Sequence, residues 1–258
     1  MAIEFVELDA ARAARGVRLV VLGMVPSPWS EAAKGIFHVK GIGAVATRFR
    51  IGDDAVKAWT GIHNAPVVMF DDEPPRSHWA DILGLAERLG GRVSLLPADD
   101  DARMRVWGLA HEIAGEGGLL WAGRVLMLHD SLTSEGKRGF PPPVASYLGN
   151  KYGYQPAAVP AARARCQAVV DLLAKAARES RSRGSRYLVG DSLTAADIYA
   201  AAAWHPFAPL DDQKCPMIPM LRKAFESLDK ALVPVIPAEL REHQAFVYAQ
   251  HLELPIQL

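Results

Sequence analysis

The sequence predicts an α+β N-terminal domain followed by an all-helical C-terminal domain. In residues 17–92, short apolar runs rich in β-branched residues alternate with segments of helical apolar spacing. From residue 102 onward the apolar residues recur at helical spacing, and one helix start carries a clear capping signal. A chain of 258 residues, half of them hydrophobic, is long enough to bury the core of such a two-domain protein.

The chain begins with an extension, residues 1–16, in which Asp9 can cap a short turn that ends at Gly16. Val17–Gly23 then has the composition of a buried strand. Pro28 suits the first position of a helix, which makes Ser27 its N-cap, and the helix should stop near residue 41.

A second strand is expected at Ala44–Ile51, where apolar and polar residues alternate. Asn64–Asp71 predicts a third strand, opened by Pro66. Arg76 and Ser77 lead into a helix with buried spacing that Gly90 closes. These elements make up the predicted domain of residues 17–92.

Residues 93–101 read as a linker, and residues 102–258 as the helical domain. A helix is expected over 102–129, broken or kinked by the glycines of 115–118, and residues 134–160 are expected to form a long loop or lid. Further helices are predicted at 161–183, 195–204, 217–232 and 239–251, before an apolar tail.

The stretch Gly190–Asp197 carries the clearest helix-start chemistry. Thr194 is a good N-cap residue, and Asp197, three positions later, can reach back to the backbone N–H of the cap. The helix that follows is apolar on nearly every side, so it belongs in the interior of the helical domain. A purely structural role for Thr194 and Asp197 follows from this pattern.

Composition excludes several functions. Lys plus Arg equals Asp plus Glu, 29 of each, so neither nucleic acid nor an acidic membrane is expected as a partner. The acidic first residues lack the pattern of a secretory signal, and Cys166 and Cys215 are isolated, so a reducing, cytoplasmic setting is expected. No metal motif, phosphate loop or nucleophile elbow is present.

Gly190-Asp-Ser-Leu-Thr-Ala-Ala-Asp197 resembles the buried-helix start in the C-terminal domain of glutathione transferases. The order of strands and helices over 17–92 resembles the thioredoxin-like domain of the same superfamily. Ser27-Pro-Trp-Ser30 is similar to its redox turn with both thiols replaced by hydroxyls, the pattern of the Ser-type members of the tau or omega kind. The resemblance spans roughly residues 17–245 and implies a cis peptide bond before Pro66.

Two interpretations of Ser27 share one geometry, because both place its hydroxyl at a helix N-terminus. In one, the hydroxyl only caps the helix. In the other, which the resemblance implies, Ser27 is the catalytic residue that hydrogen-bonds the glutathione sulfur and stabilises its thiolate. Ser30 is the lesser candidate, because a residue inside the first turn usually faces the protein.

The resemblance further implies a glutathione site built from six residues: Ser27, Asn64, Ala65, Pro66, Arg76 and Ser77. Ser77 would bind the γ-glutamyl carboxylate at a helix start, with Arg76 beside it. The family usually has an acidic residue where this chain has Arg76, and related classes often have a base where it has Asn64. His63 and Lys57 are candidates to replace that base.

A second-substrate pocket is expected between the domains. Pro28 and Trp29 would form one wall, and Met104, Trp107 and His111, which share one helix face, would form the other. The same three residues could equally be a core or interface stripe.

The function that follows from the resemblance is a cytoplasmic, homodimeric glutathione transferase with roles in detoxification. Glutathione would be the co-substrate, without a metal, and a hydrophobic electrophile its acceptor, by conjugation or thiolytic cleavage such as that of an aryl ether. The alternatives are a non-catalytic ligand-binding or interaction protein of the same fold, which the departures at Arg76 and Asn64 motivate, and a glutathione-dependent isomerase.

Overall fold

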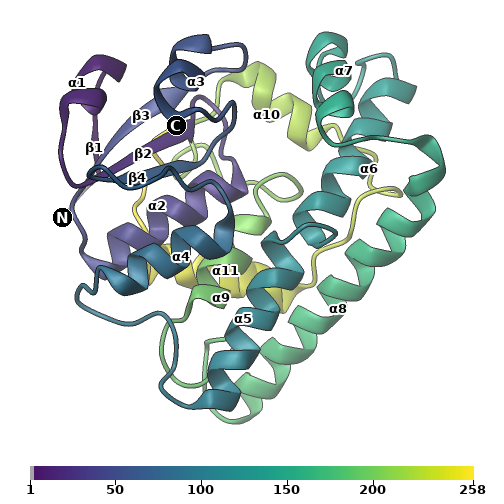
Figure 1. Cartoon of the computed structure of the whole chain (residues 1–258). Helices are drawn as coiled ribbons and strands as arrows, with labels where there is room; N and C mark the ends of the chain where they lie inside the picture. Colours follow the sequence, from purple (N-terminus) through teal and green to yellow (C-terminus); the bar gives the residue numbers. More distant parts are fainter. Residues whose placement is uncertain (1–2) are drawn as a thin grey trace.

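The computed structural model describes residues 3–258 and shows the predicted sheet-containing half followed by a helical half (Figure 1). The sheet has strand order β1-β3-β2-β4. β3 pairs in parallel with both β1 and β2, and β4 runs antiparallel to β2. The strands are β1 (Glu4–Phe5), β2 (Val17–Leu22), β3 (Ala44–Phe49) and β4 (Val67–Phe70).

Both faces of the sheet are covered because its strands are apolar on both sides. Leu19 and Val21 of β2 point to the larger core, which includes residues of α2 and α4, whereas Val20 joins a smaller cluster with Val56 of α3. The helices of this half are α1 (Leu8–Ala13), α2 (Pro28–Lys40), α3 (Asp54–Thr60) and α4 (Trp79–Arg88).

The helical half packs against α2 through its central helix, α9, all of whose residues are buried, as its apolar sequence predicts. α6 and the long α8 lie side by side, and α7 stands above α6 near α10 (Figure 1). The helices are α5 (Asp100–Ala114), α6 (Leu119–Thr133), α7 (Pro142–Lys151), the 3₁₀ turn η1 (Pro156–Ala158), α8 (Val159–Ser182), α9 (Ala195–Ala203), α10 (Pro219–Glu226) and α11 (Ala238–His251).

The start of α9 has the predicted capping box. The Asp197 carboxylate accepts hydrogen bonds from the backbone N–H and the hydroxyl of Thr194, each at 2.8 Å. It also accepts the backbone N–H of Leu188 at 2.7 Å and lies 2.9 Å from Nε2 of His243. Leu95 of the predicted linker accepts the first N–H of the helix at 2.9 Å, so this cap also fixes the connection between the halves.

Two expectations need correction and a third is confirmed. Residues 3–16 are not a separate extension, because β1 is an edge strand of the sheet and α1 packs near β3. The break expected at 115–118 is confirmed, because the stretch 102–129 forms two helices, α5 and α6, on either side of these residues. The expected long loop of 134–160 contains α7, whose prolines at its first turn are compatible with a helix start.

The apolar tail returns to the sheet half. The Lys34 ammonium donates to the carbonyl of Gln257 at 2.6 Å, and Arg48 donates to the carbonyl of Leu258 at 2.7 Å. The C-terminus therefore lies beside the sheet (Figure 1). Among residues 3–258, no helix has the length and apolar character needed to cross a membrane.

Candidate functional site

A cavity of about 230 Å³ lies between the sheet half and the helical half. Its walls are mostly apolar, and its polar lining groups are serine, asparagine, tyrosine and basic side chains, with no aspartate or glutamate. The sheet half contributes Leu22, Val25, Ser27, Trp29, Phe49, Ile51, Asn64 and Ala65, and the helical half Arg124, Phe140, Pro141, Val144, Tyr147, Leu148, Lys151, Tyr152, Met220 and Leu221.

Ser27 occupies the N-cap position of α2, as predicted, with Pro28 at the first helical position. Its carbonyl accepts the N–H of Glu31 at 2.8 Å, which starts the helix. Its hydroxyl, however, caps no backbone N–H. The side chain lines the cavity and is 5% exposed. The helix thus presents a hydroxyl group, and the positive end of its dipole, to the cavity.

Ser30 faces the other way. Its hydroxyl is fully buried and accepts the backbone N–H of Leu22, at the end of β2, with a distance of 3.1 Å. This bond ties the first turn of α2 to the sheet and uses the oxygen that a ligand would otherwise contact. Ser30 therefore supports the position of Ser27 and does not line the cavity.

Asn64 and Ala65 reach the same cavity from the loop before β4. The peptide bond between Ala65 and Pro66 is cis, as the resemblance implies, and Pro66 itself is buried. The amide oxygen of Asn64 accepts a hydrogen bond from the Lys151 ammonium at 2.8 Å. Lys151 of α7 therefore places a basic group next to Asn64, the position where related classes often have a basic residue. His63 and Lys57 do not line the cavity.

Arg76 and Ser77 lie outside the lining of this cavity. Ser77 precedes His78, which is the N-cap of α4, so Ser77 lies just before the helix start. The Arg76 guanidinium pairs with Glu73 at 2.6 Å, and Arg88 pairs with the same carboxylate at 2.6 Å. Hydrogen bonds from Arg88 and then Arg76 hold the pKa of Glu73 below its ordinary value. Arg76 is thus engaged by its own neighbour.

The aromatic wall at α2 is Trp29, whose indole N–H donates to the carbonyl of Ala114 at the end of α5, 2.9 Å away. This bond holds the ring at the junction of the two halves. Pro28, the other residue expected there, is buried and does not line the cavity. Trp29 is the expected wall residue that the structure places in the lining.

Met104, Trp107 and His111 are not part of this cavity. Met104 is 64% exposed, whereas the rings of Trp107 and His111 lie 5.6 and 6.1 Å from the ring of Trp79 on α4. The face of α5 that they share is therefore directed at α4 and solvent. This arrangement agrees with the alternative interpretation of these residues as an interface stripe. The opposite wall comes from α6, α7 and α10.

The sequence analysis missed the polar residues of that wall. Arg124 lies on α6 and Lys151 at the end of α7, together with Tyr147 and Tyr152. Phe140 is fixed there because its backbone N–H donates to the Ser131 hydroxyl at 2.8 Å. For Tyr147, Lys151 and Tyr152 the one sequence signal is the Tyr- and Pro-rich composition of 134–160, which favours a loop as much as a helix.

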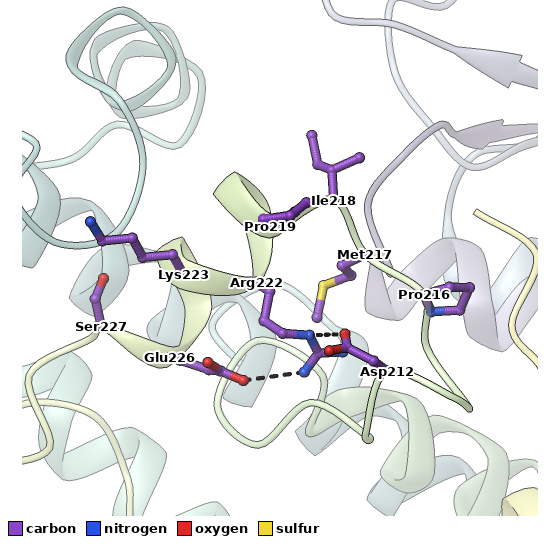
Figure 2. A pocket seen from close by; sticks show the side chains of 9 residues that line it. All are labelled: Asp212, Pro216, Met217, Ile218, Pro219, Arg222, Lys223, Glu226 and Ser227. Atoms are coloured by element: carbon purple, nitrogen blue, oxygen red, sulfur yellow. Dashed lines mark hydrogen bonds and ion pairs between the residues drawn. The ribbon is translucent and has the colours of Figure 1, made fainter.

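A larger depression, about 650 Å³, lies over α10 and its preceding loop (Figure 2), and Ser27 is not among the residues that line it. The Arg222 guanidinium in it pairs with Asp212 and with Glu226, the latter at 3.2 Å. The charge of Arg222 is therefore already neutralised by two carboxylates of the chain.

The two cysteines are not suited to act as nucleophiles. Cys166 and Cys215 are free but buried, and burial raises the thiol pKa of Cys166 to about 12 and that of Cys215 to about 11. Neither would form a thiolate nucleophile near neutral pH. No group of His, Cys, Asp and Glu side chains in this range is arranged to hold a metal ion. Thr194 and Asp197 also lie outside the cavity lining.

Neither the scan against models of protein families nor the search of curated proteins found a match to this sequence. Solved structures, in contrast, are similar over nearly the whole chain. A glutathione S-transferase domain-containing protein of Marinobacter aquaeolei VT8 has a TM-score of 0.62 and 17% identity, covering 92% of this chain and 100% of its own.

A glutathione S-transferase of Methylobacterium radiotolerans JCM 2831, in complex with glutathione sulfonate, has a TM-score of 0.59 at 18% identity, with 91% of each chain covered. A bacterial maleyl pyruvate isomerase of the zeta class has a TM-score of 0.51 at 20% identity, covering 88% of this chain and 95% of its own. The chain therefore has the glutathione S-transferase fold, a thioredoxin-like part followed by a helical part.

Proposed function

We propose that this chain, whose fold is that of the glutathione S-transferases, binds glutathione at the cavity beside Ser27 and activates its thiol for attack on an apolar electrophile. The observation that carries the proposal is the common location of Ser27 and Ala65, which lie far apart in sequence and line the same cavity. The Ser27 hydroxyl is not engaged as a helix cap, so it is free to contact a ligand.

The chemistry requires an anionic sulfur. A free thiol has a pKa of about 8.5 and is only a few per cent ionised near neutral pH. Lowering that pKa by about two units takes roughly 2.7 kcal/mol of preference for the thiolate. One hydroxyl donor to a charged acceptor, together with the positive end of α2, can supply a stabilisation of this order. Ser27 would therefore act as the donor of a Ser-type enzyme.

The remainder of glutathione would lie along the sheet half. The backbone of Ala65, next to the cis bond to Pro66, would pair with the cysteinyl part of the peptide. Ser77, before the start of α4, would bind the γ-glutamyl carboxylate. Arg76 would contribute little, because Glu73 already neutralises it. Asn64, whose amide oxygen accepts a hydrogen bond from the Lys151 ammonium, would lie beside the peptide.

Calorimetric titration with glutathione and conjugation assays over a pH series test this proposal. Ser27→Ala should retain the fold, raise the pH midpoint of conjugation and lower the rate near neutral pH. Ser30→Ala is the matched control, since its hydroxyl bonds to Leu22 and should affect stability without moving the midpoint. A Ser27→Ala protein with the wild-type rate and pH profile would reject the assignment.

The similarity to maleyl pyruvate isomerase favours a second candidate, isomerisation with glutathione as cofactor. In that case glutathione would bind and raise turnover of an isomerisable substrate without being consumed. A non-catalytic ligand-binding role would instead give glutathione binding without turnover of any electrophile in a screen. Measuring glutathione and product together distinguishes the three functions. Only a transferase consumes glutathione in proportion to the product formed.

We also infer a cytoplasmic homodimer, on the resemblance alone. Sedimentation velocity at micromolar concentration is the direct check. A single species of twice the chain's mass would support the inference, whereas a monomer at that concentration would contradict it.

A further inference from the structure

Two basic side chains line the cavity from the helical half. Arg124 projects from α6 and Lys151 from the last turn of α7. The guanidinium carbon of Arg124 lies 5.4 Å from the ring centre of Phe140 and 5.8 Å from that of Tyr152. The Lys151 nitrogen lies 5.9 Å from the same tyrosine ring. Tyr152 therefore contacts both cations and holds them at one side of the cavity.

Neither cation has an acidic partner in the described chain. No ion pair of Arg124 or Lys151 is present within residues 3–258, and the cavity lining contains no carboxylate. The Arg124 Nε atom is buried without a hydrogen-bond partner in this range. Lys151 has only the neutral amide of Asn64. By contrast, Arg222 in the depression over α10 is paired with both Asp212 and Glu226 (Figure 2).

Like charges beside an apolar cavity are unfavourable without a counterion. Partial loss of water around Lys151 at the cavity wall, and then the nearby Arg124 charge, lower the pKa of this largely exposed ammonium from its ordinary value. An anion bound between the two side chains would offset both the repulsion between the two cations and their loss of hydration. A carboxylate suits the planar guanidinium, which can donate parallel hydrogen bonds to both of its oxygens.

We propose that the electrophile accepted by this cavity is an aromatic or otherwise apolar molecule that carries a carboxylate, bound by Arg124 with Lys151. This deepens the proposed function and rests on it. The apolar walls would hold the body of the substrate, and the cations would fix its charged end. Arg124 and Lys151 would then determine specificity, since a neutral electrophile of the same shape leaves both cations unpaired.

A halogenated nitrobenzoate illustrates the chemistry. Ionisation of the glutathione thiol releases its proton to solvent, and the thiolate sulfur forms a bond to the ring carbon that carries chlorine. The carbon–chlorine bond breaks, and chloride leaves with the bonding electron pair. The carboxylate takes no part in bond making and serves only to hold the ring, so its removal changes binding and not the course of the reaction.

The test compares a benzoate bearing chlorine para and nitro meta to the carboxylate with the matched benzamide. Binding of each to the protein without glutathione is measured by calorimetry, and conjugation of each is measured with glutathione. The benzoate should bind at least about tenfold more tightly than the benzamide. Arg124→Met should bring the two affinities within about twofold, and Lys151→Met should reduce the preference severalfold.

Arg163→Met is the matched control, because Arg163 is exposed on α8 and removing it changes the net charge equally. It should leave the benzoate preference intact. Because Arg124 also stacks on aromatic rings, thermal melting of its variant checks that the fold is retained. Lys151 is largely exposed, so its variant should leave the packing of the cavity wall unchanged. Arg124→Lys should retain part of the preference.

Equal affinity for benzoate and benzamide, absence of benzoate binding at millimolar concentration, or a preference that survives Arg124→Met would each overturn the proposal. A loss of glutathione affinity matching the loss of benzoate affinity in the Lys151 and Arg124 variants would also overturn it, because the carboxylate held would then be the glycyl group of glutathione. If benzoate binds selectively but glutathione does not bind, the transferase proposal fails and with it the role of the benzoate as electrophile, whereas the binding of a carboxylate by Arg124 and Lys151 is still supported.

Discussion

The start of α9 and the start of α2 are both helix N-termini with a hydroxyl residue at the cap, yet they differ in where their polar groups are directed. At α9, Asp197 is fully buried and bonds Thr194, Leu188 and His243. At α2, the Ser27 hydroxyl caps nothing and lines a cavity. Polar groups that complete their bonds inside the protein stabilise the fold, whereas those left open at a cavity are available to a ligand.

The largest effect should come from breaking the closed cluster at α9. Asp197→Ala removes a buried carboxylate and leaves the N–H groups of Leu188 and Thr194, and the His243 ring, without their acceptor. Loss of one member of a buried, charge-assisted cluster costs about 3–5 kcal/mol. Urea unfolding monitored by circular dichroism measures this loss.

Asp191→Ala is the control, because Asp191 is an exposed carboxylate in the same loop. It should change the free energy of unfolding by less than about 0.5 kcal/mol. If Asp197→Ala leaves stability unchanged but abolishes glutathione binding, then the N-terminus of α9 serves ligand binding, which contradicts its assignment to the fold alone.

The next effect concerns a second buried polar pair, His205 and Tyr248, whose Nε2 and hydroxyl oxygen lie 2.6 Å apart. Burial, and then the Lys34 charge, lower the pKa of His205 from 6.5 to about 3. The folded protein therefore keeps this ring neutral. Below about pH 6.5 the unfolded chain binds a proton that the folded chain does not, so stability is lost as the pH falls toward 3.

At pH 5 this linkage should cost roughly 2 kcal/mol relative to pH 8. Burial raises the pKa of Glu31, which acts in the opposite direction, so the comparison uses His205→Gln to isolate the histidine. The difference in unfolding free energy between the two pH values should be smaller by about this amount in the variant. Equal pH dependence of the two proteins would show that His205 titrates normally in the fold.

Ser27→Ala should have a small effect on stability, because its hydroxyl makes no capping bond to lose. We expect a change in unfolding free energy below about 0.5 kcal/mol, compared with the ~1 kcal/mol that a functioning cap contributes. Thermal melting of the variant provides the measurement. A loss of about 1–2 kcal/mol would show instead that Ser27 caps α2 in solution.

Arg76 should matter least. Its charge is taken up by Glu73, which Arg88 also contacts, so Arg76→Ala should change glutathione affinity by less than about twofold. Calorimetry on the wild type and the variant decides this. Tighter binding in Arg76→Glu, by about tenfold, would mean that the guanidinium repels the γ-glutamyl ammonium.

The sheet-half side of the site could be predicted because its signals are local. Pro28 fixes the start of α2 and therefore the position of Ser27. In the helical half, a local signal of the same kind, the capping pattern of Thr194 and Asp197, fixes the start of α9. The cis bond at Pro66 came from the resemblance and is present. The pair of Arg76 with Glu73 is local as well, because the two residues are three positions apart in the sequence.

The opposite wall could not be predicted in the same way. α7 lies in a segment rich in Pro, Gly and Tyr, whose composition resembles a loop, and Arg124 is a single charged residue within the mainly apolar first half of α6. Only the packing of α6 beside α7 brings Arg124 and Lys151 to one cavity. β1 was missed because a strand of 2 residues carries no periodicity.

The central claim is that Ser27 stabilises a glutathione thiolate, and titration of bound glutathione tests it most directly. The ultraviolet absorbance of the thiolate, followed against pH with the protein in excess, reports the pKa of the bound thiol. We expect that pKa to lie one to two units below the free value of about 8.5 in the wild type and to return close to it in Ser27→Ala. The same depressed pKa in both proteins would contradict the claim.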